Sequence, residues 1–224
     1  MRLALSILFF LCNCAAAAPF AVQVGDARLA LDAPTGFSDT TAIGSPRLQD
    51  LAETLTSASN RILLFALTDA DLRRFTSGDP PDLKRYAVAA TPRGLERDRV
   101  RQEAFSALVT DSLRQLGTPP PAGSDYRKHL DTQEGKLALL AELRRDPEVV
   151  TVLQGTRLPT PPRASVFSDE KPPQYALTTT TLILLRGKAV NLSVFSPYDN
   201  AADIDWIRAI TARWVDELQR LNNR

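Results

Sequence analysis

The organisation of the chain is clearest in residues 174–198, QYALTTTTLILLRGKAVNLSVFSPY, which contain two apolar runs on either side of a short turn. Both runs are rich in threonine, leucine and valine, and residues of these kinds favour β-strands. Arg186-Gly187-Lys188 lies between the runs, and a short turn with glycine typically joins antiparallel strands. The stretch therefore predicts a β-hairpin.

The hairpin is followed by the clearest helical pattern of the chain, from about Ala202 to Leu221. Its apolar residues recur every three or four positions and share one stripe: Ile204, Ile207, Ile210, Trp214, Leu218 and Leu221. Such a stripe needs an apolar surface to cover, and the hairpin is the nearest one. The pattern predicts an α+β fold in which a long C-terminal amphipathic helix packs on an antiparallel sheet.

Further elements are expected upstream. Apolar or alternating runs bounded by turn-forming residues predict strands in ARLALDAP (27–34), NRILLFALT (60–68), LKRYAVAATP (83–92) and EVVTVL (148–153). A short amphipathic helix is expected from Ser45, the N-cap candidate, with Pro46 at its first position.

The middle of the chain, residues 93–145, favours helices. Apolar spacing predicts a helix over 95–116, and 126–147 has a helical pattern although it contains Gly135. The proline-rich stretch 157–173 is expected to be an irregular connection, too short and too polar to supply a second core. A single domain over residues 18–224 is therefore expected.

Residues 1–17 are expected to be a secretory signal peptide. Arg2 precedes an apolar run, and the small residues that follow it suit cleavage before Ala18. Attachment of lipid at Cys14 is disfavoured because Asn13 stands where a small residue is usual. The expected location is the bacterial periplasm or the exterior, and an uncleaved leader acting as a tether is the alternative.

Removal of this leader leaves a chain without cysteine, because Cys12 and Cys14 both lie within it, and it also removes Arg2. The remainder has 26 basic and 26 acidic residues. Binding to nucleic acid or anionic lipid requires an excess of basic residues. Neither is expected as a partner, and no stable membrane insertion is expected after cleavage.

The chain has few residues suited to nucleophilic catalysis or to binding a transition metal. The single histidine, His129, lies in the basic stretch YRKHLD, and no G-x-S-x-G motif is present. Zinc and copper sites need several imidazole or thiolate ligands. We expect His129 to be a surface residue and the protein to have no catalytic residue, metal site or cofactor.

Two aspartate clusters remain as candidates for oxygen-ligand chemistry. Asp69 and Asp71 form a D-x-D after a strand-like run, as in magnesium-dependent phosphoryl-transfer enzymes, but Arg73 departs from that motif. Asp69 is also suited to cap a short helix. Asp199, Asp203 and Asp205 lack the alternation and the glycine of a calcium loop, so they are expected to serve the start of the last helix.

A family resemblance points in the same direction. LALDAPTGF, the late hairpin and DIDWIRAITARWVDELQRLN resemble the PsbP/DcrB-like superfold, and NRILLFAL and RYAV resemble a group of uncharacterised secreted proteobacterial proteins. The resemblance implies an antiparallel sheet with helices on its faces and a role as a non-catalytic accessory or binding protein. The long helical middle, 93–145, departs from compact versions of this fold.

The expected function is that of a non-catalytic accessory or binding protein of the cell envelope, with an envelope protein or a small ligand as its partner. One alternative is a periplasmic carrier with a ligand pocket between the sheet and the middle helices. The other is a metal-dependent hydrolase that uses Asp69 and Asp71. A carrier requires an apolar cavity with a few polar groups, whereas an accessory protein requires an exposed apolar patch.

Overall fold

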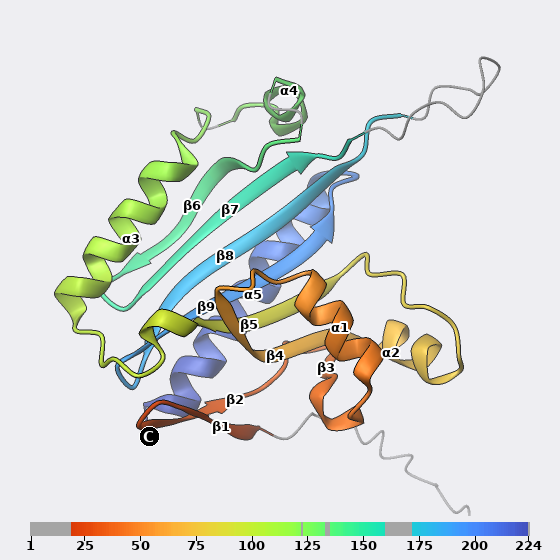
Figure 1. Cartoon of the computed structure of the whole chain (residues 1–224). Helices are drawn as coiled ribbons and strands as arrows, with labels where there is room; N and C mark the ends of the chain where they lie inside the picture. The colour runs from red at the N-terminus through yellow and green to blue at the C-terminus, as the bar shows by residue number, and fades with distance from the viewer. Residues whose placement is uncertain (1–18, 122, 133–134, 160–171, 224) are drawn as a thin grey trace, which may run out of the picture.

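The computed structural model describes residues 19–121, 123–132, 135–159 and 172–223 (Figure 1). The expected signal peptide lies outside these residues, as does most of the connection predicted over 157–173. Within the described ranges, no helix combines the length and the apolarity that crossing a membrane would require.

The described residues form one seven-stranded antiparallel sheet in the order β3-β4-β5-β9-β8-β7-β6. The strands are β3 (Phe37–Asp39), β4 (Asn60–Thr68), β5 (Tyr86–Pro92), β6 (Ala138–Asp146), β7 (Val149–Arg157), β8 (Tyr175–Leu185) and β9 (Lys188–Pro197). The predicted hairpin is confirmed: β8 and β9 are joined through Arg186 and Gly187, both of which have positive φ angles. It lies at the centre of the sheet, where β9 pairs with β5 and β8 pairs with β7.

The last helix, α5 (Ala201–Asn222), covers one face of this sheet, and Figure 1 shows it behind β8 and β9. Its buried side chains join those of the strands in one core that includes Leu177, Ile183, Leu192, Trp214 and Leu218. The α+β fold, with a single domain and a C-terminal amphipathic helix, is therefore confirmed.

A second, two-stranded sheet holds the far end of α5. Strands β1 (Phe20–Val24) and β2 (Ala27–Leu31) pair with each other, and β2 contacts the helix. The Asn222 side chain bonds both backbone groups of Ala30, at 3.0 and 2.8 Å, and Trp214 Nε1 donates to Asp32 O at 2.7 Å. The chain's first described strands are thereby fastened to its last helix.

The opposite face of the sheet carries α1 (Pro46–Thr54), α2 (Asp69–Thr76) and α3 (Gln102–Leu116). Helix α4 (Tyr126–Asp131) instead lies on the α5 face, where Leu130 joins the core. The 3-10 turns η1 (Thr41–Ile43) and η2 (Arg93–Leu95) lie in the connections. Leu48 and Ala52 of α1 pack on Phe65 and Val88, and Figure 1 shows this helix in front of β4. The helix predicted after Ser45 is thus confirmed, with Pro46 at its first position.

The helical interpretation of 126–147 is wrong. Helix α4 ends at Asp131, Gly135 has a φ of 72°, and the segment continues as the edge strand β6. Its register with β7 shifts twice, between Leu139 and Ala141 and between Glu142 and Arg144. These irregularities disturb the strict alternation of a strand, and pairing with β7 overrides a composition of helix-favouring residues.

The helix predicted over 95–116 begins later than expected, because residues 96–101 form a loop fixed by a buried lysine. Lys188 is only 1% exposed, and its Nζ donates to the carbonyls of Glu96, Arg97 and Asp98 at 3.3, 3.4 and 2.8 Å. It also pairs with Asp26 Oδ1 at 2.7 Å, a hydrogen bond that lowers the pKa of Asp26. Lys188 thus joins β9, this loop and the β1–β2 turn.

Candidate functional site

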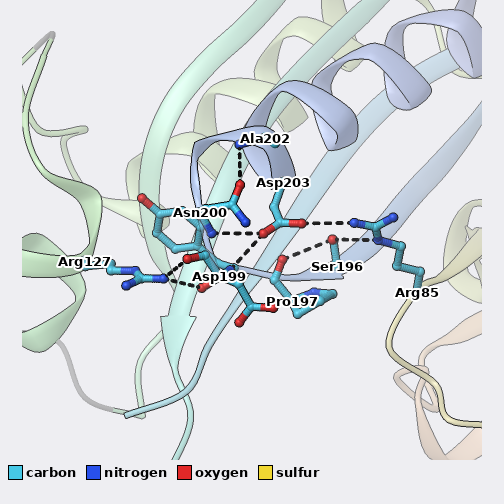
Figure 2. Close-up of polar contacts among 9 residues, drawn as sticks. Arg85, Arg127, Ser196, Pro197, Asp199, Asn200, Ala202 and Asp203 are labelled. Carbon is cyan, nitrogen blue, oxygen red and sulfur yellow. Dashed lines mark hydrogen bonds and ion pairs between the residues drawn. The ribbon is translucent and has the colours of Figure 1, made fainter. Parts of the chain in front are cut away.

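The stretch 196–206 surrounds the start of α5 (Figure 2). Asn200 is the N-cap, and its Oδ1 accepts a hydrogen bond from Ala202 N at 2.9 Å. Asp203 Oδ2 accepts from the backbone N–H groups of Asp199 and Asn200, at 2.9 and 3.1 Å. These bonds form a capping box, which satisfies backbone donors that every helix start leaves free.

Arg85, from the segment before β5, binds to this capping box from the side. Its guanidinium donates to Asp203 Oδ1 at 3.0 Å and to Ser196 Oγ at 3.3 Å. It also lies over the Trp206 ring, 4.0 Å from the centroid, in a cation–π contact. The carboxylate of Asp203, which is 8% exposed, is therefore both hydrogen-bonded and charge-paired.

Arg127 of α4 contacts the same stretch from the other side. It donates to the carbonyls of Tyr198 and Asp199, and its guanidinium lies 5.4 Å from the Tyr198 ring centroid and 5.6 Å from that of Tyr175. Figure 2 shows Arg127 and Arg85 approaching the start of the helix from opposite sides. Short α4 is held on the sheet by these contacts.

The polar groups of 196–206 are thus used within the fold. Of its three aspartates, only Asp203 caps α5, whereas Asp199 and Asp205 are exposed at the surface. The stretch serves the start of the helix, as expected from the sequence, but only one of its three aspartates has that role.

The other aspartate pair is also engaged locally, in the first turn of α2. Asp69 Oδ1 accepts from Ser38 Oγ at 2.8 Å. Asp71 is buried and accepts from Asp82 N at 2.8 Å and from Thr68 Oγ1 at 3.2 Å. The N-cap is Thr68 and not Asp69, because Asp71 N donates to the Thr68 hydroxyl. Within the described ranges, no three histidine, cysteine or acidic side chains come together as a possible metal site.

His129 lies in the last turn of the six-residue helix α4. The residue is half-buried rather than fully exposed, and its carbonyl accepts hydrogen bonds from Thr132 N and Oγ1 at 3.2 and 2.7 Å.

A cavity of about 790 Å³ lies between α1 and β4. Its apolar floor is formed by Leu48, Ala52, Ile62 and Phe65, and its polar groups include Gln49, Glu53, Arg61 and Arg93. Ligand sites have volumes of about 300–1,000 Å³, so this cavity has the size of a ligand site, and ten of its 17 lining residues are polar or charged. A smaller hollow of about 310 Å³ lies between α3 and the β6–β7 turn.

The cavity exists because the chain leaves the sheet early at this edge. Strand β3 pairs only with residues 66–68 of β4. Thr40 makes the last of these contacts with β4, since its N and Oγ1 both donate to Phe65 O at 2.9 Å. After η1 and Gly44, whose φ is 62°, the chain returns as α1. Among the described strands, only β5 pairs with residues 60–62 and 64 of β4, with a shift of register between Ile62 and Leu64.

Two residues that line the cavity, Thr56 and Arg61, each have a buried side-chain atom without a hydrogen-bond partner among the described residues: Thr56 Oγ1 and Arg61 Nε. The rest of the Arg61 guanidinium is engaged, since it pairs with Glu96 at 3.2 Å and donates to Gln23 O. Buried polar groups in folded proteins nearly always have partners. Both atoms are enclosed by protein, so they are unpaired groups of the fold beside the cavity.

The sequence did not single out this cavity. The pocket expected for a carrier lay between the sheet and the middle helices, whereas the larger cavity is beneath α1. The available signals were Arg61 at the start of the apolar run RILLFAL and a polar TSASN turn before it. Neither indicates a cavity until the position of α1 is known.

Comparisons with known proteins assign no family to the chain. No protein-family profile matches it, and no curated protein matches it. The solved structure of a point mutant of the protein Mog1 is similar, with a TM-score of 0.36 and 15% identity over 92% of this chain and 94% of that one. Of the resemblance to the PsbP/DcrB-like superfold, only the α+β architecture is supported.

Proposed function

We propose that this protein is an exported, non-catalytic binding protein of the cell envelope and that its binding site is the cavity between α1 and β4. One observation carries the proposal: a cavity of about 790 Å³, which is the volume of a ligand site, with an apolar floor formed by Leu48, Ala52, Ile62 and Phe65. The aspartates that suggested chemistry, Asp69 and Asp71, bond groups of their own fold.

The sequence supports the remaining parts of this proposal. The leader pattern of residues 1–17 favours export, and the likeness of the late hairpin and last helix to the PsbP/DcrB-like superfold favours an accessory or binding role. A small-ligand carrier is the second candidate, because the cavity volume also suits a free small molecule.

Native mass spectrometry of the protein from a periplasmic extract of its host tests this function. We expect a mass above that of the chain beginning at Ala18. The extra mass should be lost in Gln49→Phe, which places a ring in the cavity wall, and kept in Asp50→Phe, which changes the next exposed residue of α1 outside the cavity lining. Circular dichroism confirms that both variants fold.

The proposal would be overturned by a bare cleaved chain in the wild type. It would also be overturned by a bound mass that both variants retain, since the occupant would then lie elsewhere.

A further inference from the structure

The loop before α3 presents three exposed arginines, Arg97, Arg99 and Arg101, at alternate positions of the chain. Within the part of the chain that the structure describes, none of them pairs with a carboxylate. None of the three lines the cavity between α1 and β4. We propose that these residues, the arginine row, form a second binding surface that recognises an acidic segment of a partner protein.

The row exists because residues 96–101 form a loop where the sequence predicts a helix. On a helix, residues three positions apart are neighbours, so Glu96 would face Arg99 and Asp98 would face Arg101. Helix α3 begins only after this loop, and neither pair is among the ion pairs of the described residues. The loop therefore separates the arginines from the carboxylates that a helix would place beside them.

The nearby carboxylates bind other groups of the fold. Glu96 pairs with Arg61 at 3.2 Å, and Asp26 pairs with the buried Lys188 at 2.7 Å. Asp98 is the one carboxylate within the loop that has no ion pair among the described residues. The arginine row thus leaves a local excess of positive charge that the described part of the fold does not neutralise.

The backbone that carries the row is held in place. Lys188 Nζ bonds the carbonyls of residues 96–98, and Val100 N donates to Gly187 O at 2.9 Å. The stem of Arg99 lies against the same turn, since a Cβ atom on Gly187 would be 2.9 Å from Arg99 Cγ. Figure 1 shows the loop beside the turn of the β8–β9 hairpin. A surface that is fixed before binding loses less conformational entropy when a partner docks.

Carboxylates on a protein segment suit the row better than the phosphates of a nucleic acid or a membrane. Arginine binds carboxylates through two parallel hydrogen bonds. Nucleic acids and anionic bilayers instead require an extended basic surface, and here Asp98 and Glu103 are interspersed with the arginines. The chain without its expected leader also has 26 basic and 26 acidic residues. A short segment with a few carboxylates matches the charge and the short length of the row.

Fluorescence polarisation with fluorescein-labelled hexaglutamate tests the proposal on the purified protein. We expect binding at low ionic strength that weakens as NaCl is added. Arg97→Gln, Arg99→Gln and Arg101→Gln together should lower the affinity about tenfold or more, because each arginine supplies charge-assisted hydrogen bonds to a carboxylate.

A matched triple variant controls for net charge. Arg73→Gln, Arg114→Gln and Arg213→Gln together remove three exposed arginines from α2, α3 and α5. The protein loses the same charge as in the first variant, but the arginine row stays intact. We expect its affinity to stay within about twofold of the wild type, since distant exposed charges are screened. Circular dichroism confirms that both variants fold.

A change at Asp98 should act in the opposite direction. Asp98→Asn removes the carboxylate between Arg97 and Arg99, so the affinity for hexaglutamate should rise about threefold. Asp205→Asn, an exposed change at the start of α5, should leave the affinity unchanged. An equal rise in both variants would show that the affinity follows net charge and not the arginine row.

Other outcomes also overturn the proposal. The wild type would then fail to bind hexaglutamate, or the two triple variants would weaken binding equally. If oligo(dT) or phosphatidylglycerol vesicles bind more tightly than hexaglutamate and the arginine-row variant loses that binding, the surface recognises phosphates and not an acidic protein segment. Each of these results leaves the function of the cavity untouched, because Gln49→Phe tests that function separately.

Discussion

Two places where a helix meets the sheet differ in how fully their polar groups are paired. At the start of α5, Asp203 bonds two backbone N–H groups and Arg85, and the arginine in turn lies over Trp206. Beside α1, two buried polar atoms, Thr56 Oγ1 and Arg61 Nε, have no such partners in the part of the chain that the structure describes. The capping carboxylate at the start of α5 is fully used by the fold, whereas the region beside α1 keeps two buried groups unpaired.

The largest expected effect comes from breaking the paired region. Asp203→Ala removes the acceptor of two N–H groups and leaves Arg85 without its carboxylate, so we expect the free energy of unfolding to fall by about 2–4 kcal/mol. Asp205→Ala, an exposed change two residues later, should cost less than about 0.5 kcal/mol. Urea unfolding of both variants measures the difference, and equal losses would show that the capping network contributes nothing specific.

Removing one hydroxyl group from each region compares the two regions directly. Thr179 Oγ1 bonds Thr211 Oγ1 at 2.6 Å beneath α5, so Thr179→Val should lower the free energy of unfolding by about 1–2 kcal/mol. Thr56→Val removes a buried hydroxyl that has no partner among the described residues, so it should raise the same quantity by about 0.5–1 kcal/mol. A clear loss of stability in Thr56→Val, measured by urea unfolding, would mean that this hydroxyl is paired after all.

The third comparison concerns Tyr86, on the same face of the sheet as the cavity, where it stacks on Phe195 with ring centroids 4.2 Å apart. Burial raises the pKa of Tyr86 to about 12, whereas an unfolded tyrosine has a pKa of about 10. Between these values the unfolded chain loses the proton first. The stabilisation is therefore complete below about pH 10 and is lost as the pH rises toward 12.

Replacing Tyr86 with phenylalanine removes this dependence. We expect the loss of stability between pH 9 and pH 11 to be smaller in Tyr86→Phe than in the wild type by about 1 kcal/mol, a value reduced for partial exposure to solvent. Urea unfolding at the two pH values measures it. An equal loss in both proteins would show that Tyr86 titrates as it does in the unfolded chain.

Local sequence patterns predicted the elements whose residues form regular runs. The β8–β9 hairpin and α5 follow from alternation and from a helical stripe, and neither depends on distant partners. Strand β6 was mistaken for a helix because Ala138–Asp146 combines helix-favouring residues with two shifts of register, and only β7 fixes its conformation. The cavity could not be predicted, because it depends on where β3 stops relative to β4, a tertiary property.

The pairing of β5 with β9 has a consequence for how the chain is made. Thr91 Oγ1 donates to Ala189 O across 98 residues of sequence, and the two strands are neighbours at the centre of the sheet. During synthesis, β5 can pair with its second partner, β9, only once roughly the last forty residues are being made. Such distant pairing slows folding. A chain that stops before β9 would leave unpaired edges on β5 and β8, which flank the central strand of the sheet in the intact protein. Premature termination near the C-terminus should therefore yield aggregates rather than a shortened, working protein.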